Sequence, residues 1–457
     1  MDLIVANVID AYRDNVALIQ DPALRAHEVL DCYYLEDRAL FWGGDQKLVV
    51  TSQPVDPAFL ADLQAALGYR ELTVLSPAHP SDALCADILG EGALMDEIVS
   101  RLRGHGPVRL ISFVAGREVL ALAEALRARG LEVTTPECPP DDLLWVRDYL
   151  DSKSGFRRFF ASIEPAVPGV RLPEGAVCEG PAEAARVAAR FLADGRACLC
   201  KPNNSQSGVG FHILHPGDMA GDALALRGSI QARLEADSQM MGDCVVVEEL
   251  IEMDRTVGGG SPSVEMRVPA DPACDVEFLY PCGQILTPSG YFFGVEMYRD
   301  VVTPAVARTI EQAGLAMARA VRALGYVGVF DMDLVAGTDG ELCAVEVNTR
   351  RTGGTHAHEA AEALFGPRYW ERAAVISNND LVFQGPPLDY AGLRALLGDI
   401  RFPMAGAREG ILPTIVSSLA ANRLGYIAFA GDIARARALE AAFHRRLAES
   451  GRPLVVR

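Results

Sequence analysis

The sequence VGVFDMDLVAGTDGELCAVEVNTRR, residues 327–351, predicts a β-hairpin with one acidic face. With GTDG as the turn, Asp333 would lie opposite Ala344 and Asp331 opposite Glu346. Side chains alternate across a strand, so the hairpin would separate a polar face from an apolar one. The polar face would carry Asp331, Asp333, Glu346 and Asn348. The apolar face would pack on the core and carry Met332, Leu334, Cys343, Val345 and Val347.

The acidic face of this hairpin predicts a bound cation. Like charges on neighbouring strands destabilise the pair by up to about 1 kcal/mol each, and a solvated surface hairpin is the alternative interpretation. A divalent ion removes the repulsion, because Mg²⁺ takes a few carboxylate oxygens and completes its octahedron with water and substrate phosphate. The pattern therefore predicts a nucleotide-phosphate site with one or two ions.

The spacing of the polar residues resembles the metal-binding end of the ATP-grasp superfamily of carboxylate–amine ligases. Asp333 is followed thirteen residues later by Glu346-x-Asn348, and Arg350 follows two residues after Asn348. The resemblance implies that Asp333 and Glu346 hold one Mg²⁺, that Glu346 and Asn348 hold a second, and that Arg350 contacts the transferring phosphate. Asp331 lies outside this set, at a position where some members of the superfamily have arginine.

Two lysines occupy the places where the superfamily has phosphate-binding lysines. The chain has only three lysines, of which Lys153 lies in DSKSGFRRF and Lys201 in CLCKPNNSQSGVGF. Taken alone, Lys153 would be a surface helix residue and Lys201 a charge at a strand end. The loop after Lys201 contains Ser207 and Gly208, whose backbone N–H groups could cradle phosphate oxygens. No GxxxxGK[ST] motif occurs, so a P-loop is excluded.

The segment VVVEELIE, residues 245–252, resembles the adenine-binding hinge of the superfamily. The resemblance implies that Glu248 accepts from the adenine amino group and that the Glu249 carbonyl and the Ile251 amide contact the ring. For the ribose, Glu265 in SVEMR is the chosen acid and Glu252 is the alternative.

The substrate end is expected at RTGGTHAHEAAE, which follows the hairpin. A Gly-Gly turn exposes N–H groups that can bind an anionic acyl phosphate. Arg267, Arg299 and Arg351 are candidates for clamping a carboxylate. His356 and His358 are two residues apart, which is not a metal-ligand spacing on a helix. Either histidine could relay a proton, and a structural role is the alternative.

Composition excludes several classes of partner. With 42 basic and 61 acidic residues the formal net charge is −19, which disfavours nucleic acid and anionic membranes. The start, MDLIVANVID, lacks the basic flank of a secretory signal, and the longest uncharged stretch, 278–295, is interrupted by proline and glycine. We expect a cytoplasmic protein. Its ten cysteines contain no CxxC and are expected to be reduced core residues.

The 457 residues suggest about three domains. Within the first 140, expected strands (47–51, 71–75, 108–114, 131–134) alternate with expected helices (57–67, 117–129), which predicts an open parallel sheet. The turn after residue 114 lacks GxGxxG, so a dinucleotide site is unsupported. We expect an α/β protein with an ATP-grasp fold, divided into an N-terminal open-sheet (pre-ATP-grasp) domain (1–140), a lid (141–243), a catalytic core with the Mg site (244–384) and a small C-terminal module (385–457).

The phrase NTRRTGGTHAHE, residues 348–359, together with the C-terminal module, resembles the pheganomycin-type peptide ligases of antibiotic biosynthesis. The resemblance implies that ATP, with Mg²⁺ and two ions expected, phosphorylates an amino-acid-type carboxylate. The N-terminal amine of a peptide would then capture the acyl phosphate. Alternatives are a ligase acting on single amino acids or a small metabolite, a non-catalytic ATP-binding regulator, and an oxidoreductase using the N-terminal sheet. A homodimer is a possible assembly of the protein.

Overall fold

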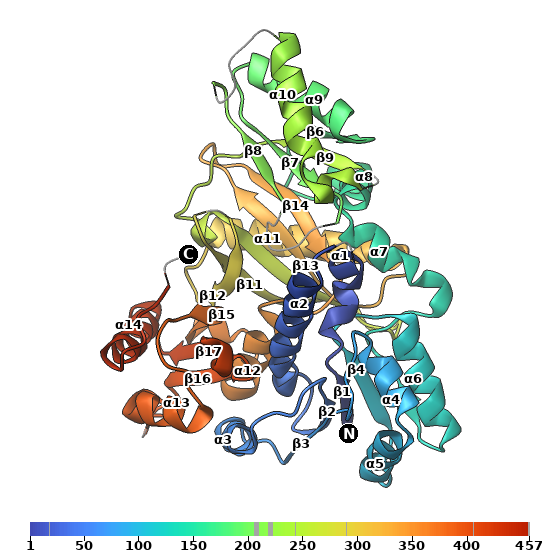
Figure 1. Ribbon diagram of the computed structural model, residues 1–457, viewed down its shortest axis with the longest axis vertical. Coiled ribbons are helices and arrows are strands. Elements are labelled where there is room, and N and C mark those ends of the chain that lie inside the picture. Colours follow the sequence, from blue (N-terminus) through green and yellow to red (C-terminus); the bar gives the residue numbers. More distant parts are fainter. Residues whose placement is uncertain are drawn as a thin grey trace.

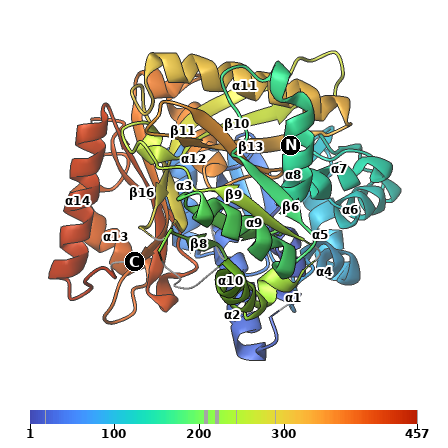
Figure 2. The same ribbon diagram turned by 90° about the horizontal axis from the view of Figure 1, so that it is seen from above.

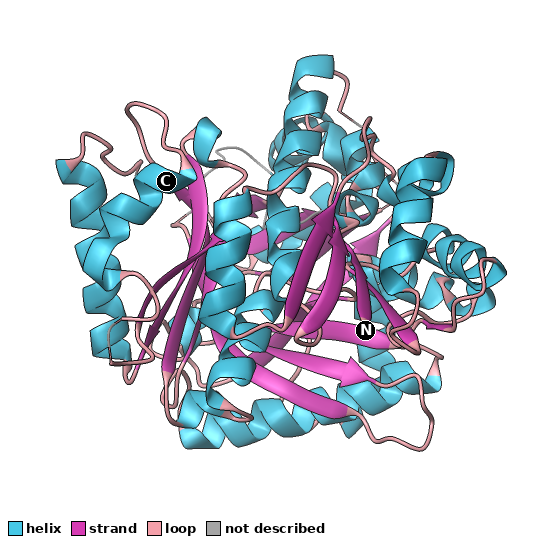
Figure 3. Ribbon diagram, turned by 90° about the horizontal axis from the view of Figure 1, so that it is seen from below, coloured by secondary structure: helices cyan, strands magenta, loops and turns pink. Residues whose placement is uncertain are grey.

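Three β-sheets, each built mainly from a different part of the chain, set the architecture (Figure 1). The structure, a computed structural model, describes residues 1–17, 19–204, 210–217, 223–242, 244–288, 290–404 and 406–455. The strands gather in the centre, and helices lie around them (Figure 3). In the described residues, no helix is long and apolar enough to cross a membrane.

The N-terminal sheet is parallel throughout, as predicted. Its strand order is β3-β2-β1-β4-β5. The strands are β1 (Asp2–Val5), β2 (Gln46–Val50), β3 (Glu71–Leu75), β4 (Val108–Ser112) and β5 (Val133–Thr134). The helices of this region are α1 (Arg13–Ala17), α2 (Pro22–Leu35), α3 (Pro57–Leu67), α4 (Leu84–Gly90), α5 (Gly92–Leu102) and α6 (Arg117–Ala128). The central strand, β1, was not predicted, because it is a run of four residues at the chain start with no turn signal before it.

The region predicted to be the lid, called the lid below, contains a small four-stranded sheet at one end of the long axis, seen from above in Figure 2. Its order is β6-β9-β7-β8, with strands β6 (Gly175–Cys178), β7 (Cys198–Pro202), β8 (His212–Leu214) and β9 (Val245–Glu249). The helices that accompany it are α7 (Trp145–Asp151), α8 (Lys153–Ile163), α9 (Pro181–Ala193) and α10 (Ala223–Glu235). Because β9 pairs with β6 and β7, the boundary expected at residue 244 falls inside this sheet.

The third sheet has eight antiparallel strands in the order β14-β13-β10-β11-β12-β15-β17-β16. Its strands are β10 (Pro262–Val268), β11 (Glu277–Leu286), β12 (Phe292–Met297), β13 (Gly328–Ala336), β14 (Leu342–Asn348), β15 (Ala374–Val382), β16 (Gly410–Ile415) and β17 (Arg423–Ala430). Its helices are α11 (Pro304–Ala323), α12 (Thr355–Phe365), α13 (Tyr390–Leu397) and α14 (Ile433–Glu449).

The expected C-terminal module is part of this large sheet. Strand β17 pairs with β15, so residues 385–457 continue the eight-stranded sheet. One hydrophobic cluster joins Ile4 and Phe41 from the N-terminal region to Tyr280 and Phe429. The two ends of the chain therefore share a core, which fixes the N-terminal segment against the eight-stranded sheet.

The hairpin β13–β14 forms with a register that differs from the predicted one. Asp333 pairs with Glu346 and Asp331 with Asn348. The turn is one residue longer than predicted, and a β-bulge at Val345 adds a second extra residue to β14, so the pairing is shifted by two residues. A shift of two residues leaves each side chain on the same face, so the predicted acidic face survives the error in register.

The bulge also changes the apolar face of the hairpin. Leu342, Ala344 and Val347 lie in the core, where Cys343 and Val345 had been predicted. The extra residue, Val345, lines the same cavity as its acidic neighbour Glu346.

Candidate active site

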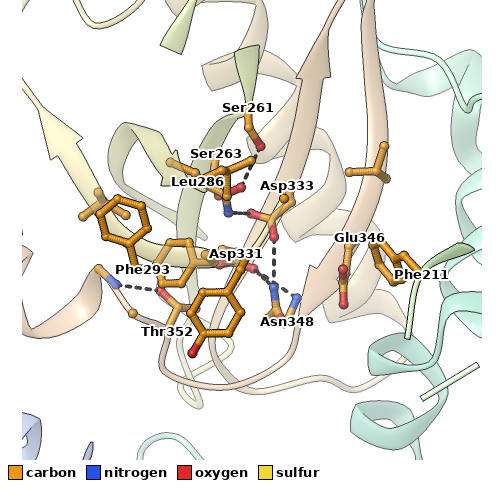
Figure 4. Close-up of a pocket in the computed structure, with 18 of the residues that line it drawn as sticks. Phe211, Ser261, Ser263, Leu286, Phe293, Asp331, Asp333, Glu346, Asn348 and Thr352 are labelled. Carbon is orange, nitrogen blue, oxygen red and sulfur yellow. Dashed lines mark hydrogen bonds between the residues drawn. The ribbon is translucent and has the colours of Figure 1, made fainter. Parts of the chain in front are cut away.

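A cavity of about 490 Å³ lies between the lid, the hairpin and the N-terminal helix α2. Figure 4 shows the hairpin acids lining it. The lid end is lined by residues that include Pro173, Leu199, Lys201, Phe211, Glu248 and Ile251. The opposite end is lined by residues that include Glu28, Asp31, Leu35, Arg38, Asp380 and Arg423. Asp331, Asp333, Glu346, Asn348 and Arg350 also line it. The hairpin therefore presents its acids to a cavity with a lid end and an α2 end.

Two hairpin carboxylates, those of Asp331 and Asp333, are buried and share a hydrogen-bond donor. Asp333 Oδ1 accepts from Gln284 Nε2 at 2.8 Å, and Asp333 Oδ2 accepts from Asn348 Nδ2 at 3.2 Å (Figure 4). Asn348 Nδ2 also donates to Asp331 Oδ1 at 2.8 Å. Burial, and then the charge of Glu346, raises the pKa of Asp333 to about 6. Burial, and then the charge of Asp333, raises the pKa of Asp331 well above its ordinary value.

This donor set fits Mg²⁺. Asp333 and Glu346 face each other across the strand pair, and Asn348 adds an amide on the same strand as Glu346. In the described part of the chain, no three acidic, histidine or cysteine side chains gather as a complete metal site. An incomplete set of oxygen donors is what Mg²⁺ uses when water and substrate phosphates supply the remaining ligands.

The two predicted lysines both reach the site. Lys153 Nζ donates to Glu346 Oε1 at 3.0 Å, and Lys201 Nζ lies 2.5 Å from Glu248 Oε2. The two ammonium groups are 5.7 and 5.6 Å from the centre of the Phe211 ring. Both lysines are buried, so neither is a surface residue. The predicted loop residues Ser207 and Gly208 lie outside the described residues.

The acidic hinge is held by arginines. Glu248 Oε1 accepts from Arg157 Nη1 at 2.9 Å, so its carboxylate is shared between Arg157 and Lys201. Glu249 accepts from Arg171 at 2.7 Å and from Arg196 at 2.9 Å. These pairs fix the end of β9 beside the cavity.

An apolar slot follows the hinge. Ile251 lines it with Pro173, Leu199 and Val345. The backbone N–H of Ile251 donates to no partner among the residues that the structure describes. Apolar side chains beside a free backbone donor suit the edge of an adenine ring.

Neither candidate for the ribose acid lines the cavity. Glu265 is 1% exposed, and its carboxylate accepts from Tyr280 at 2.7 Å, Thr352 at 2.7 Å and Thr355 at 2.9 Å. Burial raises its pKa to about 7. These donors all belong to the protein, so Glu265 joins β10, β11 and the start of α12 underneath the site. The other candidate, Glu252, accepts from Thr338 N through its backbone oxygen at 2.9 Å.

Of the predicted arginines, only Arg350 lines the cavity. Its Nη2 donates to Asn348 Oδ1 at 2.9 Å. Arg351 points away and is held in the interior by Glu137 and Glu359. Although burial opposes its charge, these two acids raise the pKa of Arg351 above its ordinary value.

The remaining predicted side chains are also used elsewhere. Arg267 pairs with Glu277 at 2.9 Å, and Arg299 donates to the Glu371 carbonyl at 2.5 Å. His356 and His358 are buried and do not line the cavity. Burial lowers the pKa of His358 to about 3 and that of His356 well below its ordinary value, so both are neutral. Their burial supports the structural alternative.

Sequence reasoning missed Arg38 and Arg423, which line the α2 end of the cavity. They come from opposite ends of the chain and belong to no local motif. A second, polar cavity of about 450 Å³ was also missed. It shares Tyr12, Asn348 and Arg350 with the first, so these three residues stand where the two cavities meet.

The chain is similar to known proteins in sequence and in fold. Residues 36–128 match the family described as the pre ATP-grasp domain. The L-propargylglycine–L-glutamate ligase of Streptantibioticus cattleyicolor is 28% identical over 375 residues, which are 73% of this chain and 70% of that protein.

Two solved structures share the fold at low identity. Biotin carboxylase from Campylobacter jejuni aligns with a TM-score of 0.53 and 12% identity, over 100% of this chain and 92% of that one. N5-carboxyaminoimidazole ribonucleotide synthetase from Thermus thermophilus aligns with a TM-score of 0.50 and 15% identity, over 98% of each chain. The match to the pre ATP-grasp domain and the similarity to this ligase, together with the shared fold, support an ATP-grasp carboxylate–amine ligase that uses ATP and forms ADP.

Proposed function

We propose that this ligase activates an amino-acid-type carboxylate as an acyl phosphate and joins it to the N-terminal amine of a peptide in natural-product biosynthesis. The observation that carries the proposal is that Lys153, Lys201, Arg350 and the hairpin acids converge around one cavity. The α2 end of that cavity leaves space for an acid beyond the phosphate-binding groups. We place the reaction in the cytoplasm, where ATP is available.

The lid end would bind ATP. The apolar slot at Ile251 would take the adenine, and the two lysines would bind phosphate oxygens as point charges. Asp333, Glu346 and Asn348 would hold Mg²⁺, which neutralises phosphate charge. Each lysine already has a carboxylate partner that lines the cavity, Glu346 for Lys153 and Glu248 for Lys201, which holds its ammonium group beside the cavity before nucleotide arrives.

The chemistry has two balanced steps. A carboxylate oxygen of the acid attacks the γ-phosphorus of ATP, and ADP leaves. The amine nitrogen then attacks the acyl carbon, phosphate leaves, and the amine gives up a proton. Arg350 would stabilise the transferring phosphoryl group, and positioning with fixed charges would supply most of the rate, as in other phosphoryl transfers.

A single amino acid is the second candidate for the acceptor. The relative from Streptantibioticus cattleyicolor is named for joining L-propargylglycine to L-glutamate, which are both single amino acids. The two acceptors differ in length, so a series of acceptors from one to four residues separates them.

The test is ADP and phosphate release with Mg·ATP across amino acids, unusual amino acids and short peptides, with hydroxylamine as a surrogate amine. We expect acid-dependent ADP release and a hydroxamate of the acid. AMP in place of ADP would show that the mechanism is wrong, and ATP binding without turnover of any acid would favour a regulator.

A further inference from the structure

The cavity contains a guanidinium group that the proposed chemistry has not used. Arg38 lies in the 3₁₀ helix Glu36–Phe41, directly after α2, and lines the cavity. It is 4% exposed, and the described residues place no carboxylate within 4.0 Å of it. Its Nε donates a hydrogen bond to the Leu35 carbonyl at 3.1 Å. Arginine is almost never buried without a partner, because removing its charge from water costs several kcal/mol.

Two other arginines of this protein, one buried and one half-buried, show the usual arrangement. Arg351 is 2% exposed and has two carboxylate partners, Glu137 and Glu359. Arg423 lines the same cavity as Arg38 and pairs with Asp31 at 2.6 Å and Asp380 at 2.7 Å. Arg38 differs from both, so its charge is left for something that enters the cavity.

The acids next to Arg38 in sequence are occupied elsewhere. Glu36 accepts from Ser52 N at 2.5 Å and Ser52 Oγ at 2.7 Å. Asp37 accepts from the backbone N–H groups of Val416 at 2.7 Å and Ser417 at 2.8 Å. These bonds tie the 3₁₀ helix to the segment after β2 on one side and to the segment after β16 on the other. They place Arg38 rigidly without neutralising it.

Arg38 stands close to the arginine assigned to the phosphoryl group. Arg38 Cζ lies 5.8 Å from the centre of the Phe113 ring, and Arg350 Cζ lies 5.6 Å from the same centre. Arg350 also lies 5.4 Å from the Tyr12 ring. Two like charges against one aromatic ring attract an anion between or beside them, since the ring alone offsets only part of their repulsion.

We propose that Arg38 binds the carboxylate of a substrate, as a bidentate partner beside Arg350. A carboxylate matches the fork of a guanidinium, and its charge supplies the partner that Arg38 lacks. This inference rests on the proposed function, because the cavity must hold an amino-acid-type acid or an acceptor with its own carboxylate. The carboxylate could belong to the acid or to the acceptor, and kinetic measurements distinguish these two sources.

The kinetic test compares Arg38→Gln with the wild-type enzyme on the acid and amine that support the highest turnover. With hydroxylamine as the amine, only the acid carries a carboxylate. We expect the KM for the acid to rise about 10- to 100-fold, the range for losing a charge-assisted hydrogen bond, with ATP affinity unchanged. If only the KM for the natural acceptor rises, the carboxylate belongs to the acceptor. If neither KM changes in an active enzyme, the proposal is overturned.

A second readout separates binding from a structural role. The wild-type enzyme should bind the substrate acid more tightly than its primary amide, which is tested as a competitive inhibitor. In Arg38→Gln the ratio of the two affinities should be about tenfold smaller. Arg38→Lys keeps the positive charge but not the two parallel donors of the guanidinium, so its preference for the acid over the amide should lie between those of wild type and Arg38→Gln. Arg299→Gln, on the surface, is the matched control and should match wild type.

A third readout does not depend on turnover. An unpaired buried charge destabilises the protein, so Arg38→Met should unfold at or above the wild-type Tm without substrates. Arg351→Met, which leaves two acids unpaired, should unfold well below it. An Arg38→Met protein that loses as much Tm as Arg351→Met would show a structural role and overturn the inference. A wild-type enzyme that turns over no acid would instead count against the proposed function.

Discussion

Replacing Glu346 with glutamine tests the acidic hairpin most directly. Glu346 lies opposite Asp333, accepts from Lys153 at 3.0 Å, and its side chain is 20% exposed. Glutamine keeps the shape and one acceptor oxygen but removes the charge. Losing one preorganised electrostatic contact costs about 10²–10³-fold in rate, or about 3–4 kcal/mol. We expect ADP formation with saturating acid to fall by at least that factor.

The fold should tolerate this change. Losing one charge of a buried pair can cost about 3–5 kcal/mol, but here it also relieves repulsion, because Glu346 helps to raise the pKa of Asp333. We therefore expect the free energy of unfolding to change by less than about 2 kcal/mol. The matched control is Glu341→Gln on the exposed turn of the same hairpin, where Glu341 pairs with Arg171. Wild-type ADP release by folded Glu346→Gln would refute the metal assignment.

Three further predictions test separate parts of the structure. Lys201→Met should weaken ATP binding at least about tenfold, measured by calorimetry, because a charged phosphate contact is lost. Arg351→Met should lower the free energy of unfolding by about 3–5 kcal/mol in denaturant, because Glu137 and Glu359 lose their partner. The pKa of Glu265 is raised from its ordinary 4.5 to about 7, so its contribution to stability is present below about pH 4.5 and is lost as pH rises through 7. Glu265→Gln should remove about 3 kcal/mol of that pH dependence, seen as the wild-type-minus-variant difference in unfolding free energy.

The hairpin shows why the nucleotide-phosphate end could be predicted from sequence. Its ligands are close together in the chain, and strand periodicity assigns them to a face whatever the detailed register. The prediction made the turn one residue too short and did not include the extra residue Val345 at the bulge. Together these errors shift the pairing by two residues, so the acidic side chains stay on the predicted face. An error of one residue would have placed Asp333 and Glu346 on opposite faces.

The lysines were found for a different reason. Lysine is rare in this chain, so Lys153 and Lys201 stood out against an arginine background. Arginine gave no such contrast, and Arg267, Arg299 and Arg351 were predicted only because a guanidinium can bind a carboxylate through two hydrogen bonds. Local sequence could not show that acids already hold Arg267 and Arg351, because Glu137 and Glu359 lie in other elements and Glu277 lies on the neighbouring strand.

The α2 end of the cavity required long-range contacts that no short pattern contains. Arg38 is positioned by Asp37, which accepts from residues 416 and 417 near the other end of the chain. The N-terminal and C-terminal regions share one hydrophobic cluster, so this wall forms only when both ends have folded together. The phosphate end depends on a local hairpin and two lysines, whereas the α2 end depends on packing between distant segments. Substitutions in that shared packing should therefore alter the choice of acid or acceptor while leaving the phosphate-binding groups in place.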